Sequence, residues 1–198
     1  MVNGRLPVVT NATAPVYLKE ETSFKPLCNQ KGKVMSPNLK IYFAGSIRAG
    51  RADAELYDCI VKKLGKYGTV LTTFVADPKT TATSSEEDGA KTDKEIHDRD
   101  VKLLEECHAI VAEVTQPSLG VGYEIGRGVA MGKRILCLYR PQPNKILSAM
   151  IRGADIDGQF VTKDYKEEEL SGILEDFFTK VLGRDSKNSL DWKTYEPM

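Results

Sequence analysis

The sequence predicts an α/β protein with a Rossmann-like, doubly wound, mostly parallel five-stranded sheet and helices on both faces. Three observations predict this class. Short apolar and β-branched runs alternate with longer amphipathic segments between residues 39 and 182. Glycines such as Gly45, Gly68 and Gly132 end the elements. The length of 198 residues, with 28% charged and 41% hydrophobic residues, suits one domain with tails.

The first half of this domain contains two predicted strands, a helix and a long loop. Lys40–Ala44 is apolar and is predicted as a strand, and Thr69–Val75 is β-branched and aromatic and is predicted as a second one. Ala52–Tyr67 between them has helical periodicity. Asp77–Ala90 is rich in Thr, Ser, Asp and Gly and predicts a loop of a length that is usually functional. The expected inward face of the helix consists of Leu56, Ile60, Val61 and Leu64.

A capping box opens the second half. Thr92 and Glu95 have the spacing at which their side chains satisfy exposed N–H groups reciprocally, so a helix is predicted from Thr92 to about Cys107. His108–Val114 is predicted as the third strand and Tyr123–Met131 as a short helix. The expected inward residues of the helix that begins at Thr92 are Ile96, Leu103 and Leu104.

The last predicted elements are two strands and an amphipathic helix. Arg134–Tyr139 and Gln159–Thr162 are the fourth and fifth strands, and Glu167–Leu182 closes the domain. Residues 1–38 and 183–198 lack a sustained period and are predicted as tails, the first of them flexible. The expected buried side of the last helix consists of Leu170, Ile173, Leu174, Phe177, Phe178 and Val181.

Composition excludes several classes of function. Lys and Arg (28) balance Asp and Glu (28), so no excess of positive charge exists to bind a nucleic acid polymer or an acidic membrane. No apolar run approaches the roughly 18–20 residues of a membrane span, and no signal peptide is expected. No cysteine pair has zinc-site spacing, and neither His97 nor His108 completes one, so no metal is expected. Cys59, Cys107 and Cys137 are expected to be buried, which fits a reducing compartment.

The turn after the first predicted strand has the features of an anion site. Gly45-Ser46-Ile47-Arg48-Ala49-Gly50-Arg51 leads into a helix N-terminus, where backbone N–H groups can bind an anion. Ser46 can add a hydroxyl, and Arg48 or Arg51 can bind phosphate bidentately. Arg51 and Ala52 stand where a P-loop has Lys and Ser or Thr, which disfavours an ATPase. From the residues alone, a plain turn with surface arginines is an equal alternative.

A glycine-rich segment with a carboxylate follows the third predicted strand. Thr115–Gly126 holds three glycines whose spacing misses the dinucleotide fingerprint by one residue, and Ser118 can bond a phosphate oxygen. Glu124 is expected in the first turn of a helix at the carboxyl edge of the sheet, where the helix dipole favours an ionised, potentially nucleophilic carboxylate. Alternatively, Glu124 simply satisfies the helix N-terminus.

Other polar and aromatic residues leave alternatives open. Tyr42 in the first strand is a core aromatic or a site residue. Glu113 is unusual in a buried strand, and it is either a paired structural carboxylate or a group that points into the cleft. Asp98 and Asp100 follow the long loop on the Thr92 helix and are candidate acids.

Four segments carry a family resemblance: Ile41–Arg48, Val111–Glu124, Arg134–Pro141 and Ile146–Gly153. They resemble the 2′-deoxynucleoside 5′-phosphate N-hydrolases, which are relatives of the nucleoside 2-deoxyribosyltransferases. The resemblance runs in order from about residue 39 to residue 180, and both tails lie outside it. The segment from Val111 to Glu124 is the longest and most specific.

The resemblance implies a homodimer with shared active sites and no cofactor. It would split a 2′-deoxynucleoside 5′-monophosphate into free base and 2-deoxyribose 5-phosphate. Glu124 would be the nucleophile that forms a covalent deoxyribosyl-enzyme, Tyr42 would position it, and Asp100 would help the base to leave. The implied substrate-binding residues are Gly45, Ser46, Ile47, Arg48, Ser118 and Gly120, with Ser148 and Met150 reaching in from the neighbouring subunit.

The resemblance also suggests a role in sanitising the nucleotide pool, because 5-hydroxymethyl-deoxyuridine monophosphate is a characteristic substrate of the family. We expect a cytoplasmic and nuclear location. One departure concerns Phe74, which stands where family members carry a His near the base pocket and leaves base preference open.

Three rival functions are weaker. A nucleoside 2-deoxyribosyltransferase is opposed by the phosphate-type loop with Arg48 and Ser118. A cytokinin-type phosphoribohydrolase is opposed because Glu124 comes one residue too early for its PGGxGTxxE motif. A non-catalytic nucleotide-binding protein is opposed because Tyr42, Asp100 and Glu124 are all present, and a pure binder needs no nucleophile.

Overall fold

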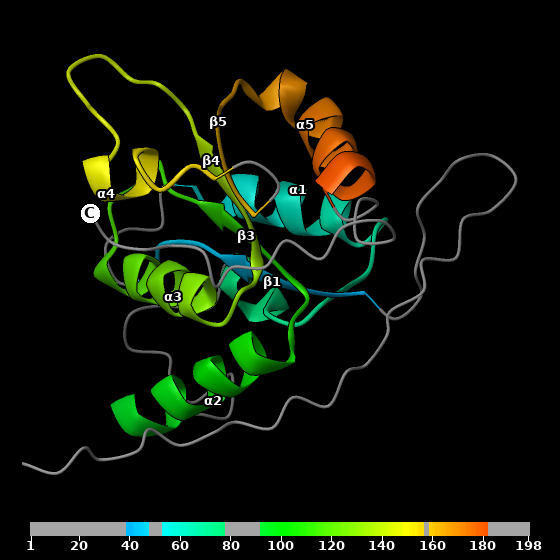
Figure 1. Ribbon diagram of the computed structural model, residues 1–198, viewed down its shortest axis with the longest axis vertical. Helices are drawn as coiled ribbons and strands as arrows, with labels where there is room; N and C mark the ends of the chain where they lie inside the picture. Colours follow the sequence, from blue (N-terminus) through cyan, green and yellow to red (C-terminus); the bar gives the residue numbers. More distant parts are fainter. Residues whose placement is uncertain (1–38, 48–52, 78–91, 157–158, 182–198) are drawn as a thin grey trace, which may run out of the picture.

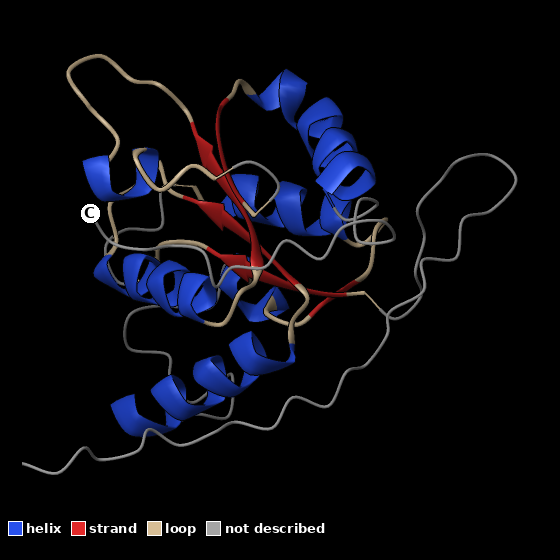
Figure 2. Ribbon diagram, viewed as in Figure 1, coloured by secondary structure: helices blue, strands red, loops and turns tan. Residues whose placement is uncertain are grey.

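A parallel β-sheet forms the centre of the protein, which confirms the predicted α/β class (Figures 1 and 2). The computed structural model describes residues 39–47, 53–77, 92–156 and 159–181, so the predicted tails lie outside the described residues. Five strands follow the order β2-β1-β3-β4-β5, and every neighbouring pair is parallel. The strands are β1 (Lys40–Ala44), β2 (Thr69–Val70), β3 (Ala109–Glu113), β4 (Arg134–Tyr139) and β5 (Phe160–Asp164).

Helices cover both faces of this sheet (Figure 1). On one face lie α1 (Ala54–Leu64) and α5 (Leu170–Asp176), with the short helix η2 (Glu167–Glu169) before α5 and the π-helical turn η3 (Phe177–Val181) after it. On the other face lie α2 (Asp93–Glu106), α3 (Leu119–Ala130) and the short α4 (Ala149–Arg152). Among the described residues, no helix is both long and apolar enough to cross a membrane.

Strand β1 shows how the side-chain alternation assigns residues to the two faces. Ile41 and Phe43 pack into the core under α1 and α5. Tyr42 and Ala44 pack into the second core, under α2 and α3. Because successive side chains of a strand point to opposite faces, Tyr42 must lie on the side of the sheet that α3 covers.

The strand order creates a topological switch point between β1 and β3. These strands are neighbours, but α1 leaves β1 on one face of the sheet and α2 enters β3 from the other. Such a switch point at the carboxyl ends of parallel strands is where ligands bind in doubly wound folds. The residues that follow the two strands, Gly45-Ser46 after β1 and Val114-Thr115 after β3, are therefore at the position where a site is expected.

The second strand is shorter than predicted. It ends at Val70, and Thr73–Ala76 forms a 3₁₀-helix, η1, in place of the predicted continuation to Val75. The reason lies in Thr72, whose buried hydroxyl accepts from the N–H of Phe43 at 2.8 Å and donates to the carbonyl of Phe43 at 2.7 Å. The Thr72 side chain thus makes the hydrogen bonds to Phe43 that the backbone of a longer β2 would make, and the backbone turns into a 3₁₀-helix instead.

Several other elements differ from their predicted bounds. Helix α3 begins at Leu119, four residues before the predicted start at Tyr123, and α4 was not predicted. Cys107 and Cys137 are buried as expected, but Cys59 is exposed, so that expectation was wrong. Cys59 lies off the buried side of α1, which includes an unpredicted member, Tyr57. The buried residues of α1 are Leu56, Tyr57, Ile60 and Leu64.

Candidate active site

Tyr42 and Glu124 meet in the core beneath α3. The hydroxyl of Tyr42, which is only 1% exposed, donates a hydrogen bond of 2.9 Å to Oε1 of Glu124. Gly128, one turn beyond Glu124, allows this approach, because a Cβ there would collide with Ile110 and Ile135 of the sheet. Strand β1 and helix α3 thus hold a tyrosine and a carboxylate in one arrangement, although 82 residues separate them.

Glu124 does not serve the helix N-terminus. Because α3 starts at Leu119, Glu124 lies in the second turn, and the expectation of a first-turn position was wrong. Ser118 is the residue that caps this helix, since its Oγ accepts from the N–H of Val121 at 3.4 Å. The alternative in which Glu124 merely satisfies the helix end is therefore excluded, and its carboxylate is available for other chemistry.

Burial dominates the electrostatics of this carboxylate. Burial raises the pKa of Glu124 to about 7; the hydrogen bond from Tyr42 opposes that rise, the negative charge of Asp100 adds to it, and Arg99 opposes it. Burial and the nearby Glu124 also raise the pKa of Tyr42 well above its usual range. Tyr42 is therefore a neutral donor near pH 7, while Glu124 changes charge there. A buried carboxyl group whose pKa is tuned to neutral pH by burial and by neighbouring charges is typical of active sites.

Asp100 approaches this pair from α2. Its negative charge raises the pKa of both Tyr42 and Glu124, as expected for a carboxylate nearby. The Nε of Arg99 pairs with Oδ1 of Asp100 at 2.9 Å, and the Arg99 guanidinium lies 4.1 Å from the centre of the Phe74 ring. The three predicted catalytic residues therefore form one cluster, supported by Arg99 and Phe74.

Ser46 lies on the other side of the switch point and is a candidate for ligand binding. It is fully buried, and among the described residues its Oγ has no hydrogen-bond partner. Buried hydroxyls are normally paired, so this one is available to a bound molecule. Its backbone N–H donates to the hydroxyl of Tyr57 at 3.1 Å, and Gly45 gives the Tyr57 ring the space it needs. Ile47 is half-buried, and Arg48 lies outside the described residues.

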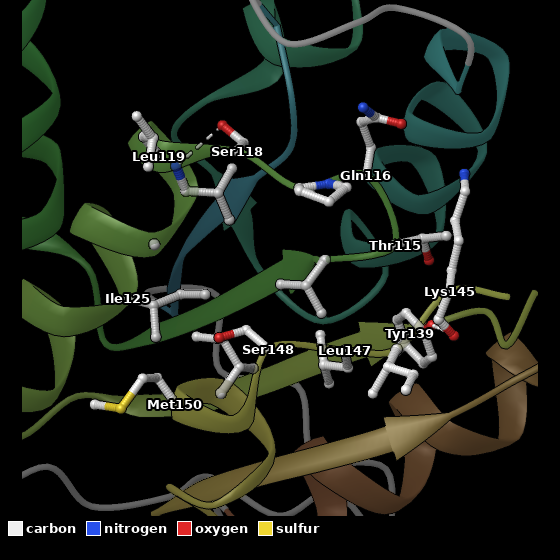
Figure 3. Close-up of a pocket in the computed structure, with 16 residues that line it drawn as sticks. Thr115, Gln116, Ser118, Leu119, Ile125, Tyr139, Lys145, Leu147, Ser148 and Met150 are labelled. Carbon is white, nitrogen blue, oxygen red and sulfur yellow. Dashed lines mark hydrogen bonds between the residues drawn. The ribbon is translucent and has the colours of Figure 1, made fainter.

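A separate cavity of about 740 Å³ opens beside the N-terminus of α3 (Figure 3). Ser118 lies on one wall, and Ser148 and Met150 come from the opposite segment, at α4. Gly120, although predicted with these residues, is exposed and does not line the cavity. The structure therefore places the described candidate residues in three groups: the Tyr42 cluster, the turn at Ser46, and this cavity. Helix α3 connects the Tyr42 cluster with the cavity, and Gly120 belongs to none of the three.

Two site residues were missed by the sequence reasoning. Arg99 was overlooked, although it adjoins Asp100 in the chain, because nothing local predicts its stacking on Phe74 from η1. Tyr57 was overlooked because it extends the apolar side of α1 and looks like a core residue. As to metals, the described part of the chain contains no group of three or more His, Cys, Asp or Glu side chains placed to hold an ion.

The raised pKa of Glu124 can be tested without any knowledge of function. Carboxyl ¹³C NMR titration should give Glu124 a pKa of about 7. Tyr42→Phe should raise it further, because the lost hydrogen bond stabilises the charged form. Tyr67→Phe is the matched control, since it removes a hydroxyl that bonds the distant Glu175. An ordinary glutamate titration in the wild-type protein would contradict the assignment.

Comparison with known proteins identifies the family. The sequence model described as "Nucleoside 2-deoxyribosyltransferase" matches residues 41–169. The 5-hydroxymethyl-dUMP N-hydrolase of Danio rerio is 57% identical over 140 residues, which cover 71% of this chain and 96% of that protein. The protein of the same name from Homo sapiens is 51% identical over 138 residues, covering 70% of this chain and 78% of its own length.

Two further similarities complete the comparison. A putative 2′-deoxynucleoside 5′-phosphate N-hydrolase 1 of Nematostella vectensis is 53% identical over 144 residues, covering 72% of this chain and 95% of that protein. A solved structure of a Clostridium botulinum CMP N-glycosidase has a TM-score of 0.46 and 20% identity, over 70% of this chain and 98% of that one. The chain belongs to the nucleoside 2-deoxyribosyltransferase family, among its 2′-deoxynucleoside 5′-phosphate N-hydrolases.

Proposed function

We propose that this protein hydrolyses the N-glycosidic bond of 2′-deoxynucleoside 5′-monophosphates to give free base and 2-deoxyribose 5-phosphate. The observation that carries the proposal is the buried Tyr42–Glu124 pair at the switch point of the sheet, with Asp100 beside it. The names of the relatives support 5-hydroxymethyl-dUMP as one substrate. Removal of this nucleotide would keep a modified base out of the nucleotide pool.

In the first step, Glu124 attacks the sugar. Tyr42 holds Oε1, and the other carboxylate oxygen, Oε2, attacks C1′ in this proposal. A C1′–O bond forms as the C1′–N bond breaks, and the electron pair of the broken bond goes to the base nitrogen. Asp100 assists by hydrogen bonding or protonating the leaving base. The transition state resembles an oxocarbenium ion, which the negative charge of Glu124 stabilises.

In the second step, water cleaves the ester between Glu124 and C1′. Asp100 takes a proton from the attacking water, a new bond forms between the water oxygen and C1′ as the C1′–O bond to Glu124 breaks, and 2-deoxyribose 5-phosphate is released. Both steps use one nucleophile and one acid/base group, as in retaining glycosidases. The neutral Tyr42 hydroxyl stabilises the carboxylate that is regenerated, because its raised pKa keeps it a hydrogen-bond donor.

The 5′-phosphate lies beside Ser46 in this proposal. The unpaired buried hydroxyl of Ser46 supports this, because a phosphate oxygen would satisfy it. Ser118 contributes from the start of α3, where backbone N–H groups also favour an anion. Tyr42 next to the sugar would reject ribonucleotides by crowding a 2′-hydroxyl, so a ribonucleotide should be turned over far more slowly than its deoxy counterpart.

One assay tests the reaction. The full-length protein is incubated with 5-hydroxymethyl-dUMP or dGMP, with and without an added acceptor base, and the products are separated by liquid chromatography. Release of free base without new nucleotide supports hydrolysis. Transfer of the sugar to the acceptor would instead support a deoxyribosyltransferase. No product from either substrate would overturn the enzyme assignment.

The active form is a homodimer in this proposal. Three apolar side chains at the cavity beside α3 are almost fully exposed: Leu119 at 97%, Ile146 at 96% and Met150 at 83%. Large apolar groups gathered at one place on a surface mark an interaction site. A second copy would cover them, and each copy would then bring Ser148 and Met150 to the phosphate region of the other.

Met150→Asp should therefore convert the dimer into a monomer, because the charge would be buried unpaired in the interface. Light scattering coupled to size-exclusion chromatography measures the change. Ile156→Asp is the control, since Ile156 is also an exposed apolar residue but does not line the cavity. A wild-type protein that is monomeric at the concentrations of the assay would refute the dimer.

A further inference from the structure

Arg99 and Asp100 make a contact that their helix does not favour by itself. They are consecutive residues of α2, and Nε of Arg99 pairs with Oδ1 of Asp100 at 2.9 Å. Side chains one position apart on a helix point in directions about 100° apart and do not face each other. An arginine side chain also loses much rotamer freedom when it is held in one place. A support outside α2 is therefore needed to keep the Arg99 guanidinium beside Asp100.

Phe74 provides this support from η1. The centre of its ring lies 4.1 Å from Cζ of Arg99, well inside the roughly 6 Å range of a cation–π contact. The side chains of Arg99 and Asp100 are only 23% and 19% exposed, so water competes weakly for either of them. Cation–π contacts are stronger where solvent is excluded. The aromatic face therefore fixes the guanidinium on one side, while Asp100 accepts from its Nε.

Thr72 fixes Phe74 relative to the strand that carries Tyr42. The buried hydroxyl of Thr72 bonds both the N–H and the carbonyl of Phe43, which follows Tyr42 in β1. The carbonyl of Phe74 accepts from the N–H of Asp77 at 3.2 Å within the turn of η1. The Phe74 side chain also packs against the core under α1. Through η1, strand β1 is therefore connected to α2 past the edge strand β2.

We propose that Phe74 is a positioning residue for the acid/base step: the face of its ring holds the Arg99 guanidinium beside Asp100, and so keeps Asp100 in its place near Glu124. The charges of Arg99 and Asp100 both act on the pKa of Glu124, as expected of a pair that lies close to the nucleophile. The proposal rests on the proposed function, because it takes Asp100 as the group that assists the leaving base.

Carboxyl ¹³C NMR titration of Glu124 tests the placement of Arg99 without turnover. The groups that act on Glu124 are Tyr42 from β1 and the charged Arg99 and Asp100 from α2. Phe74→Leu removes the aromatic face and releases Arg99, whose charge lowers the pKa of Glu124, so that pKa should rise. Phe74→Leu added to Arg99→Gln should give no further rise, because the two residues act through one contact. Phe74→Tyr keeps the ring and should preserve the wild-type pKa.

Two nucleotides whose bases differ as leaving groups test the effect on Asp100. The base of 5-fluoro-dUMP departs more readily than that of 5-hydroxymethyl-dUMP, because fluorine withdraws electrons, so it needs less help from Asp100. In Phe74→Leu, kcat/KM should fall about five- to tenfold for 5-hydroxymethyl-dUMP and less than about twofold for 5-fluoro-dUMP. Phe74→Tyr should restore most of the lost kcat/KM, since it keeps the face on which Arg99 stacks.

Val75→Ala is the matched control. Val75 is the next residue of η1 and is buried in the core under α1, so its truncation also removes packing from this segment. The melting temperature should fall in both Val75→Ala and Phe74→Leu, but the pKa of Glu124 should rise only in Phe74→Leu. An unchanged pKa in Phe74→Leu, the same rise in Val75→Ala, or equal losses of kcat/KM for both nucleotides would each overturn the proposal. Absent base release by the wild-type protein would instead refute the proposed function, and the titrations would still decide whether Phe74 places Arg99.

Discussion

Glu124→Gln should reduce kcat for release of the base by at least about 10³-fold, because an amide cannot form the glycosyl ester. The substitution keeps the size of the side chain and an oxygen that can accept from Tyr42, so the fold should be retained. KM should change little, since the 5′-phosphate and the base are bound by other residues. Steady-state kinetics with 5-hydroxymethyl-dUMP gives both parameters.

A matched control and a direct observation strengthen this test. Glu105→Gln makes the same chemical change at an exposed position of α2 and should leave kcat unchanged. Acid quenching of the wild-type protein during turnover, followed by mass spectrometry, should find 2-deoxyribose 5-phosphate attached to Glu124. If Glu124→Gln retained a tenth of the wild-type kcat, Glu124 would not be the nucleophile.

The activity should also rise with pH as Glu124 ionises. Burial places the pKa of Glu124 at about 7, and only the charged form can attack C1′. Below this pH the carboxyl group is protonated and the rate falls; above it Glu124 is charged and no longer limits the rate. A glutamate with an ordinary pKa would give full activity well into the acid range, so the position of this acid limb reports the burial of the site.

The sheet was predictable from local patterns, and the pairing of Tyr42 with Glu124 from the family resemblance. The apolar runs fixed all five strands in order, and the alternation in Lys40–Ala44 is enough to separate Tyr42 from Phe43. A family resemblance over the Val111–Glu124 segment then indicated which of the polar residues to bring together. The local patterns do not predict the burial of the Glu124 side chain or its raised pKa, because elements far apart in the chain produce that burial.

The wrong bounds of β2 and α3 have a common physical cause. Thr72 ended β2 and Ser118 started α3, in both cases through a side-chain hydrogen bond to the backbone of a kind that hydrophobic periodicity does not register. The earlier start of α3 moved Glu124 away from the helix end, so burial and not the helix dipole sets its charge. The guanidinium of Arg99 stacks on the ring of Phe74. Phe74 lies in η1, which forms because the strand ends before Thr72.

Asp100→Asn should lower kcat by about 10²–10⁴-fold, the usual range for loss of a general acid or base. The loss should be larger for a base that leaves poorly and smaller for one that departs readily as an anion. The same substitution should move the acid limb of kcat/KM to lower pH, because the negative charge of Asp100 raises the pKa of Glu124. A slower enzyme that titrates at lower pH is therefore the expected result.

Arg99→Gln should move that limb in the opposite direction. The charge of Arg99 lowers the pKa of Glu124, so its removal should shift the limb to higher pH, while kcat on the plateau should fall much less than in Asp100→Asn. Asp98→Asn is the control for both, since Asp98 is an exposed acid on the same helix that pairs with Lys94. We expect the acid limb to move in opposite directions in Asp100→Asn and Arg99→Gln and to stay in place in Asp98→Asn. This result would show that the charges of both Asp100 and Arg99 act on Glu124. Shifts in the same direction would mean that the variants disturb the site in a general way, and the catalytic cluster as described would be wrong.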